Sequence, residues 1–300
     1  MENKILIPVD FEEQSLLALE YAMYFSDILS SEIHLLHIIE ETGVIKKMFN
    51  NKSEFSKFEA DVQKMLDLEK EKFGNKYKVI TKIAYGKVYE QIEEYVEQIN
   101  PVFILMGKTE KPGLKKRIVG SNTLHTVNEV KNPVISIRGS KVHKPTEEER
   151  LIFVPLDINR NFREQITTAV EFAKLFKSKI KLMSIDRTNS AAQETKLLTN
   201  LKTTQNYINN QGIKCEAELV DDSKLPINEI INNNAVKSNA HLVVIMTRDE
   251  DNMLEFFMGS NARSILETCD IPVLSVKPWK KDDANPIFSV LYDPLNIYYK

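Results

Sequence analysis

The sequence has little of what several classes of protein depend on. Its two cysteines, Cys215 and Cys269, fit neither a disulfide framework nor a paired metal knuckle, and they favour reduced thiols in a cytoplasmic chain. The 9 glycines and 11 prolines are too few for a fibrous or low-complexity architecture. Apolar runs are far shorter than the roughly 20 residues of a membrane-spanning helix, and the first ten residues lack the apolar stretch of a signal peptide. We therefore expect a cytoplasmic globular protein without a membrane partner.

An excess of charge of one sign is also missing. The 40 lysines and arginines against 43 aspartates and glutamates give a formal net charge of -3. A dedicated nucleic-acid binder normally has a strong basic excess, so nucleic acid is not an expected partner. The histidines form no HxxxH or HxH pair, so no metal site is predicted. What the chain does have is 42% hydrophobic and 28% charged residues, enough apolar material for packed cores in about two domains.

The chain contains an internal repeat, because segments of its first half recur in the same order in its second half. The matching pairs are ILIPVD (5–10) with IFVPLD (152–157), EYA (20–22) with EFA (171–173), IHLLHI (33–38) with IKLMSI (180–185), VFILM (102–106) with LVVIM (242–246), GSN (120–122) with GSN (259–261), and NPVISI (132–137) with IPVLSV (271–276). Such a collinear series indicates duplication of a whole domain. We predict a first domain over 1–140, a polar linker over 141–150, a second domain over 151–278 and a tail over 279–300.

Within each half, short β-branched runs alternate with longer helical patterns. In the first half, strands are expected near 3–9, 32–38, 77–83, 102–106 and 133–137, and helices near 13–29, 54–73, 87–99 and 120–129. In the second half, strands are expected near 151–156, 179–185, 213–219, 242–246 and 272–276. The run VFILM is apolar throughout, which is typical of a strand covered by helices on both faces. The alternation predicts an α/β fold of two tandem, doubly wound, parallel five-stranded sheets. We take the strand order to be 3-2-1-4-5, which sets the first strand beside the fourth.

In such sheets, ligands bind beyond the carboxyl ends of the strands, where the direction of winding reverses. Asp10 ends the first predicted strand and Gly107 follows the fourth, so we expect the two residues to lie at one edge. Gly120 and Ser121 begin the next helix, whose free N–H groups and dipole attract an anion. These positions make the edge a candidate anion site.

The sequence resembles the universal stress protein family (UspA-like), as a tandem member with two such domains. The resemblance is carried by Pro8-Val9-Asp10, Met106-Gly107, Gly120-Ser121 and the closing strand NPVISI, and it covers roughly residues 3–138 and 151–277. It implies a Rossmann-like fold of the adenine nucleotide alpha-hydrolase type and a non-catalytic stress-response module. For ATP-binding members, it further implies that ATP, with Mg, contacts the edge described above. The implied contacts are Pro8, Asp10 and Ile38 on the adenine side, and Gly107, Gly120, Ser121, Asn122 and Thr123 at the phosphates, with Met106 beside them.

One departure from the family pattern puts this ligand in doubt. ATP-binding members have Gly, two residues, Gly, nine residues and Gly-Ser or Gly-Thr, and here Glu110 replaces the middle glycine. A carboxylate repels a polyphosphate, and a Cβ disfavours a positive φ. The same loop carries basic residues that can neutralise phosphate: Lys108, Lys111, Lys115, Lys116 and Arg117. Two interpretations stay open, a nucleotide site in the first half or a structural turn with solvated lysines.

The second half departs further. The repeat alignment sets Thr247 in the place of Gly107, with a loop one residue shorter. That loop is acidic, with Asp249, Glu250, Asp251 and Glu255 against Arg248 alone. We therefore predict a degenerate second site, made of Pro155, Asp157, Gly259 and Ser260, that rejects a triphosphate.

No catalytic constellation is present, because the chain has no GxSxG, HExxH, GxxxxGK[ST] or GxGxxG motif. We predict a binding or regulatory module rather than an enzyme, with an adenine nucleotide as the expected ligand. Two alternatives remain. One is a slow ATPase, in which Asp10 acts with a divalent metal. The other binds no nucleotide and acts through protein partners, as a pseudo-dimer of the two domains or as a homodimer.

Overall fold

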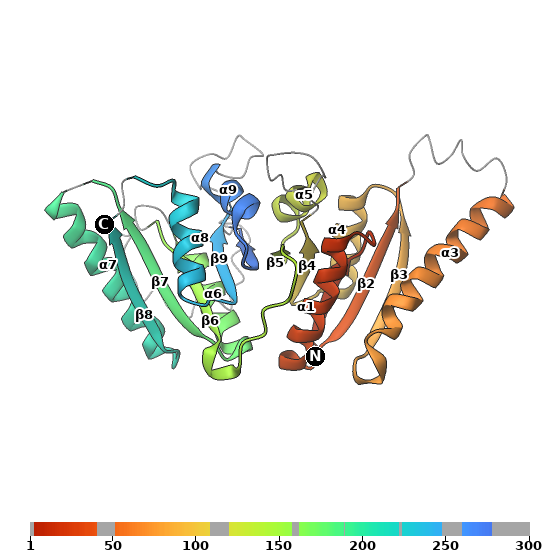
Figure 1. Cartoon of the computed structure of the whole chain (residues 1–300), viewed down its shortest axis with the longest axis horizontal. Helices are drawn as coiled ribbons and strands as arrows, with labels where there is room; N and C mark the ends of the chain where they lie inside the picture. Colours follow the sequence, from red (N-terminus) through yellow and green to blue (C-terminus); the bar gives the residue numbers. More distant parts are fainter. Residues whose placement is uncertain are drawn as a thin grey trace. The chain divides into compact units, whose positions relative to one another are not determined.

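The computed structural model describes residues 3–40, 52–108, 120–157, 162–188, 190–221, 224–247 and 260–277. The chain divides into two compact units, Met1–Val142 and His143–Lys300 (Figure 1). Several features predicted from the sequence lie outside the described residues: the basic loop 109–119 with Glu110, the acidic loop 248–258, Gly259 and the tail 279–300. Among the described residues, no helix combines the length and apolar character needed to cross a membrane.

The first unit is a parallel sheet with helices on both faces. Its elements are β1 (Lys4–Pro8), α1 (Glu13–Leu29), β2 (Glu32–Ile39), α3 (Lys52–Glu71), η1 (Gly74–Lys76), β3 (Val79–Tyr85), α4 (Val88–Ile99), β4 (Phe103–Gly107), α5 (Ser121–Glu129) and β5 (Val134–Ile137). The strands pair in parallel in the order β3-β2-β1-β4-β5. The predicted order 3-2-1-4-5 is therefore confirmed.

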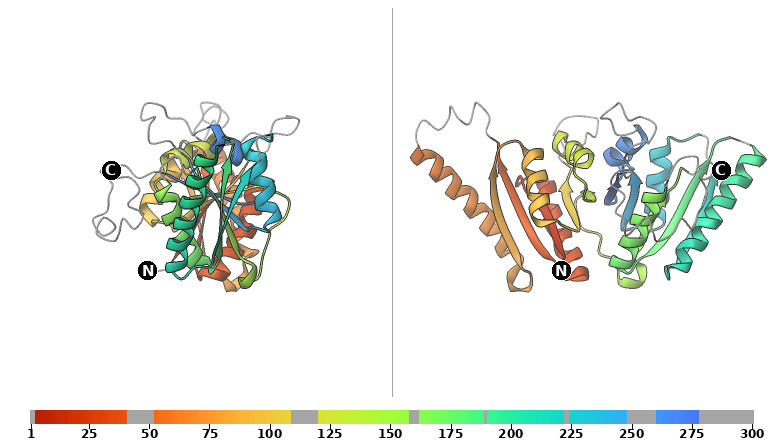
Figure 2. Two further views of the ribbon diagram at one scale, coloured as in Figure 1. Left: turned by 90° about the vertical axis from the view of Figure 1, so that its left-hand side faces the viewer. Right: turned by 180° about the vertical axis from the view of Figure 1, so that it is seen from behind.

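The second unit repeats this scheme. Its elements are η2 (Glu147–Glu149), β6 (Leu151–Pro155), α6 (Arg163–Phe176), β7 (Lys179–Asp186), α7 (Ala191–Asn210), β8 (Cys215–Asp221), α8 (Ile227–Lys237), β9 (Leu242–Met246), α9 (Ser260–Thr268) and β10 (Val273–Val276). Its strands are also parallel, in the order β8-β7-β6-β9-β10. Helices α7 and α8 lie on opposite faces of this sheet (Figure 2), so both units are doubly wound.

The central strands form the core because they are apolar on both faces. Residues 5–7 of β1 and 103–105 of β4 are completely buried. Helix α4 shows how an amphipathic segment seats on such a sheet: it buries Ile92 and Val96, one turn apart, and ends at Asn100, whose φ of 44° is left-handed. Burial of apolar surface on both faces therefore holds each sheet between its helices.

The register of the strands corrects one alignment of the repeats. Gly107 is the last residue of β4 and Met246 the last of β9, and each lies opposite the last residue of the neighbouring strand, β5 or β10. Thr247 follows one residue later, in the place of Lys108. The prediction that Thr247 replaces Gly107 is therefore wrong, and the residue at that position is Met246.

The same register makes the loops after β4 and β9 equal in length, since each reaches its glycine, Gly120 or Gly259, after the same number of residues. The expectation of a shorter second loop is therefore wrong. Both errors have one cause. VFILM and LVVIM are apolar throughout, so sliding one against the other by one residue changes no polar position.

The predicted linker is ordered at its carboxyl-terminal end. Thr146 and Glu149 form a capping box around η2, and the Arg150 side chain donates to the Phe176 carbonyl at 3.1 Å. Lys177 also pairs with Glu147 at 3.2 Å. This part of the segment is therefore attached to the second unit.

Candidate functional site

The carboxyl edge of the first sheet brings most of the predicted site residues together. Strand β1 pairs with β4, with Leu6 beside Ile104, and with β2, with Pro8 beside Leu36. Helix α5 follows β4 and runs back along the sheet, so its amino terminus lies at this same edge (Figure 1). The predicted residues placed here are Pro8, Asp10, Ile38, Met106, Gly107, Gly120, Ser121, Asn122 and Thr123.

These residues differ in how far a ligand could reach them. Asp10 and Ser121 are exposed. The side chains of Met106 and Thr123 are only 5% and 3% exposed, so they support the site from within the core. The remaining predicted residues are half-buried. A ligand at this edge would therefore contact backbone and the exposed side chains rather than all nine positions.

Asp10 has a structural role of its own. Its Oδ1 accepts a hydrogen bond from the Glu12 amide at 3.0 Å. Its own amide donates to Ser15 Oγ at 3.3 Å, and this hydroxyl donates to the Glu12 carbonyl at 3.0 Å. These bonds form an Asx turn that leads the chain from β1 into α1. An aspartate at this position is thus explained without a ligand.

Gly107 is likewise required by packing. A Cβ built on it would lie 2.3 Å from the Gln14 carbonyl carbon and 2.6 Å from the Ser15 nitrogen, both backbone atoms. The first turn of α1 therefore approaches β4 as closely as it does only because position 107 has no side chain. In the second unit Met246 holds this position, so α6 cannot approach β9 in the same way.

Glutamines near the starts of α1 and α6 make different bonds and do not occupy matching positions. Counted back from the left-handed residues that end the two helices, Ser30 and Lys177, Gln165 corresponds to Ala18. Gln14 exchanges two hydrogen bonds with the backbone of Gly139, at 3.1 and 3.2 Å. Gln165 instead donates to the carbonyls of Pro155 and Val244, at 2.9 and 2.8 Å. Because proline has no N–H, Pro155 cannot donate to the neighbouring strand, and the Gln165 amide supplies donors there. In the second unit a buried amide thus fills the space between the ends of β6 and β9.

The turn after β1 contains a residue that sequence reasoning missed. Phe11 has a φ of 64°, which is rare for a bulky side chain, and its ring lies 4.8 Å from that of His37. His37 Nδ1 lies 2.8 Å from the Val9 carbonyl, so this nitrogen carries the proton and donates. No sequence signal indicates a left-handed phenylalanine, so the aromatic pair beside Asp10 could be found only in the structure.

The amino terminus of α5 is suited to an anion. Its N-cap residue is Gly120, which has no side chain with which to cap the helix. The first amides of α5 therefore lack the intrahelical partners that later amides have, and the helix dipole adds a partial positive charge there. Lys108, at the end of β4, is only 2% exposed. Within the described residues, no three His, Cys, Asp or Glu side chains are arranged to hold a metal.

In the second unit, the structure places three of the four predicted residues. Pro155 ends β6, Asp157 is exposed just beyond it, and Ser260 begins α9. Gly259 lies outside the described residues. Pro155 and Ser260 thus occupy the places of Pro8 and Ser121, but the carbonyl of Pro155 is occupied by Gln165.

Comparison with known proteins agrees with this architecture. A universal stress protein from Archaeoglobus fulgidus DSM 4304 has the same fold, with a TM-score of 0.70 at 20% identity over 92% of this chain and 99% of its own. Universal stress protein MJ0577 of Methanocaldococcus jannaschii is 28% identical over 155 residues, which are 46% of this chain and 96% of that protein. A further Archaeoglobus fulgidus universal stress protein, solved in complex with dAMP, has a TM-score of 0.36 at 20% identity and covers 43% of this chain and 98% of its own.

The sequence model of the Universal stress protein family matches the chain twice, over residues 1–138 and 150–277. These two matches take in most of the 300 residues and fall in the two compact units. The chain therefore belongs to the universal stress protein family, as a member with two such domains in tandem.

Proposed function

We propose that the first unit binds an adenine nucleotide, with ATP and Mg as the expected ligand, and that the second unit does not. The observation that carries this proposal is the difference between Gln165 and its counterpart in the first unit, Ala18. In the second unit the buried Gln165 amide is bonded to the carbonyls of Pro155 on β6 and Val244 on β9. Ala18 has no amide group, so at the matching place of the first unit no side-chain amide lies between β1 and β4.

The phosphates would bind at the uncapped start of α5. Backbone amides from Ser121 onward supply donors there, and the helix dipole favours negative charge. The base would lie toward β2, near Ile38, as the family resemblance implies. Magnesium would arrive with the nucleotide, and the exposed carboxylate of Asp10 is an oxygen donor at this edge.

This proposal is tested by the thermal stability of the full chain with ATP and Mg. A ligand selective for the native state must raise stability, by about 2.7 kcal/mol at a hundred times its Kd. We expect the melting temperature to rise with nucleotide, and Gly120→Val to abolish the rise because its side chain obstructs the approach to α5. Gly259→Val is the matched variant in the second unit and should leave the rise intact. No rise at millimolar ATP, or the reverse pattern of variants, would overturn the proposal.

We further propose that the module regulates through occupancy rather than turnover. Asp10 is engaged in the turn that starts α1, where its Oδ1 accepts from the Glu12 amide. Phosphate release from ATP by the purified chain should therefore stay at the level of a no-protein blank. Release that Asp10→Asn abolishes would instead establish the slow ATPase.

A second candidate function is a module that acts through protein partners without nucleotide. It is favoured by Gly107, which the packing of α1 requires whether or not a ligand binds. The predicted domain limits, 1–140 and 151–278, and a homodimer or pseudo-dimer remain part of this proposal. So does a cytoplasmic location, for which the support is that Cys215 and Cys269 form no disulfide.

A further inference from the structure

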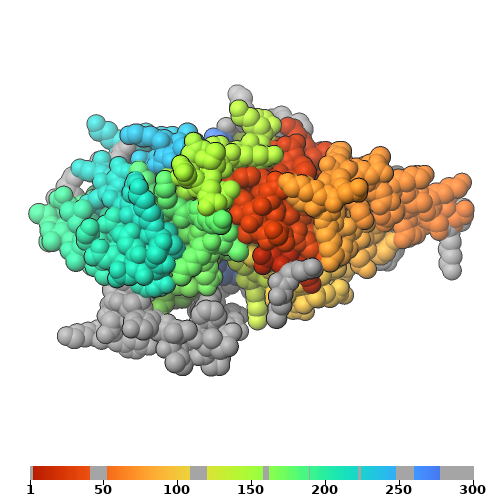
Figure 3. Space-filling view, turned by 90° about the horizontal axis from the view of Figure 1, so that it is seen from below, coloured from red at the N-terminus to blue at the C-terminus, as the bar shows by residue number. Residues whose placement is uncertain are grey.

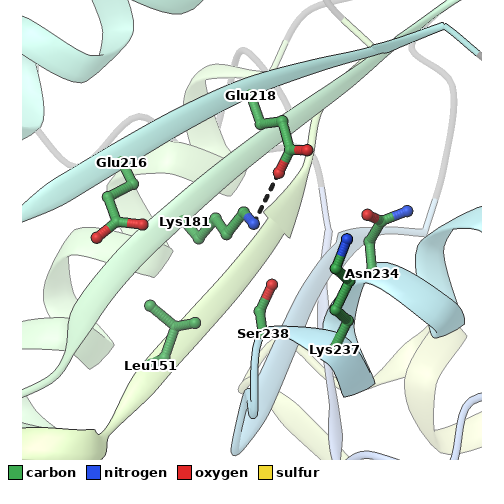
Figure 4. A pocket seen from close by; sticks show the side chains of 7 residues that line it. All are labelled: Leu151, Lys181, Glu216, Glu218, Asn234, Lys237 and Ser238. Atoms are coloured by element: carbon green, nitrogen blue, oxygen red, sulfur yellow. Dashed lines mark ion pairs between the residues drawn. The ribbon is translucent and has the colours of Figure 1, made fainter.

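The second unit has a small cavity toward the amino ends of its strands, away from its own carboxyl edge. It measures about 180 Å³ and is lined by Leu151, Lys181, Glu216, Glu218, Asn234, Lys237 and Ser238 (Figure 4). These residues come from β6, β7, β8 and the last turn of α8. Helix α8 ends toward the edge where the strands begin, the edge that faces the viewer in Figure 3. Nucleotide-sized ligands occupy cavities of about 300 Å³ or more, so this one suits a smaller molecule.

The first unit shows how this cavity arose. The equivalent of Asn234 there is Tyr95, because each lies five residues before a left-handed asparagine at the end of its helix, Asn239 or Asn100. The Tyr95 hydroxyl lies 2.8 Å from Nδ1 of His34, so the tyrosine spans the space between α4 and β2. Asn234 is shorter and folds back onto its own helix, donating to the Ile230 carbonyl at 2.8 Å. The space that a tyrosine fills in one repeat is therefore open in the other.

The residues that line the cavity are also more polar than their counterparts in the first unit. By strand register and helix end, Glu216 stands in the place of Ile80 and Ser238 in the place of Ile99. Lys237 likewise replaces the neutral Gln98. Such changes gain nothing in apolar packing, and they surround an open space with groups that bind polar ligands.

The charges of the cavity define what fits it. Lys181 and Glu218 already neutralise each other, with Nζ and Oε2 2.7 Å apart. That leaves one acid, Glu216 on β8, and one base, Lys237 on α8, without an ion pair to any other described residue. Figure 4 shows them on opposite sides of the cavity, with the Ser238 hydroxyl between them. A ligand that satisfies both walls must carry one charge of each sign.

We propose that this cavity binds a small zwitterion of the α-amino acid class. The ligand carboxylate pairs with Lys237 and accepts from the Ser238 hydroxyl, and the ligand ammonium pairs with Glu216. The half-buried Leu151 provides apolar surface for a short aliphatic side chain. A pair of charge-assisted hydrogen bonds would fix the orientation of the ligand.

The test is an NMR titration of the full chain, following the backbone amides of Glu216 and Ser238. L-Alanine should give saturable shifts at both amides. Acetate and ethylammonium, each with only one of the two charges, should give none at equal concentration and ionic strength. Equal shifts with acetate alone would show a simple anion site and would overturn the proposal, as would no saturable shift with L-alanine.

Three variants locate the site. Lys237→Gln and Glu216→Gln each remove one charge at an exposed position and should weaken L-alanine binding about tenfold or more, without changing the melting temperature. Asn234→Tyr restores the side chain of the first repeat and should abolish binding by filling the cavity. Gln98→Ala, at the matched position of the first unit, should have no effect. If Asn234→Tyr leaves the affinity unchanged, the ligand binds elsewhere and the assignment fails.

Discussion

Replacing His241 by valine should remove a specific loss of stability in acid. His241 immediately precedes β9, the fourth strand of the second unit, and is only 2% exposed. Its Nδ1 lies 3.0 Å from the Leu151 carbonyl oxygen and 3.1 Å from the Leu151 amide nitrogen, and its Nε2 is buried without a hydrogen-bond partner in the described part of the chain. The protonated ring carries an N–H on both nitrogens, so protonated His241 would have an N–H at Nε2 with no acceptor available. In the first repeat, Val102 occupies the equivalent position.

The size of the effect follows from the pKa. Burial is the main cause that lowers the pKa of His241 to about 3, and the nearby positive charge of Arg150 acts in the same direction. Since the folded pKa lies below that of the unfolded chain, the unfolded state binds the proton more readily, and stability falls as the pH drops from about 6.5 toward about 3. Between pH 8 and pH 5, this one residue should cost about 2 kcal/mol of unfolding free energy.

Urea unfolding at a series of pH values, followed by circular dichroism, measures this cost. At neutral pH, the unfolding free energy of His241→Val should be about 1 kcal/mol below that of the parent, because the hydrogen bond to Leu151 is absent. On acidification to pH 5, the unfolding free energy of the parent should fall by about 2 kcal/mol more than that of His241→Val. The two curves of stability against pH should therefore cross. His143→Gln, at an exposed histidine of the same unit, should keep the parental slope. Parallel curves for the parent and His241→Val would refute this reasoning.

Three further outcomes follow from the packing. Tyr95→Phe removes the donor to the buried His34 and should cost about 1–3 kcal/mol in urea unfolding, since an acceptor is left unsatisfied. Gly107→Ala should cost about 1–3 kcal/mol or more, because the new methyl group meets the backbone of Gln14. Burial raises the pKa of the Cys215 thiol to about 12, so a thiol reagent should label it in the native protein at pH 8 only at the rate of unfolding.

Each of these outcomes has its own control. For Tyr95→Phe the control is Tyr77→Phe, which removes an exposed hydrogen bond from the Tyr77 hydroxyl to Asp27. It should lower the unfolding free energy by less than about 1 kcal/mol. A loss equal to that of Tyr95→Phe would contradict the reasoning. For Gly107→Ala the control is Gly212→Ala, whose new methyl group meets no atom within 4 Å. It should lower the unfolding free energy only by the backbone strain of a φ of 81°, and it should leave α1 unchanged. If the reagent labels Cys215 as fast in the native protein as in urea, the thiol is accessible and the expectation of protection by burial is contradicted.

His34 shows a related network in the first unit. Burial is the main cause that lowers its pKa, although the Glu32 carboxylate, 2.6 Å from Nε2, opposes this. Neutral His34 donates from Nε2 to Glu32 and accepts the Tyr95 proton at Nδ1, and Lys78 pairs with the other oxygen of Glu32. Protonation would make His34 Nδ1 a donor, so the Tyr95 hydroxyl would then accept, and the present direction of this hydrogen bond would be lost in acid.

The sequence was sufficient for the architecture because hydrophobic patterning, the internal repeat and the family motifs all indicate the same fold. The apolar run at 102–106 and the i, i+3, i+4 spacing from Ile92 to Val96 predicted a covered strand and its helix, and both are present. The repeat and the family motifs at Pro8-Val9-Asp10 and Gly120-Ser121 predicted two domains of one fold, and the order of the strands confirms it.

The details of the site were not predictable, for physical reasons. A glutamine at a helix start can reach several carbonyls, so nothing in the sequence distinguishes Gln14, bonded to Gly139, from Gln165, bonded between two strands. The left-handed Phe11 contradicts its own backbone preference and depends on the turn around it. The part played by Gly107 in admitting α1 appears only when the distance to the neighbouring backbone is known.

The central claim, one nucleotide site in the first unit and none in the second, is tested most directly by counting. Native mass spectrometry of the full chain with ATP and Mg should show a single nucleotide adduct, and Gly120→Val should remove it. Two adducts per chain, none at millimolar nucleotide, or one that persists in Gly120→Val would contradict the account.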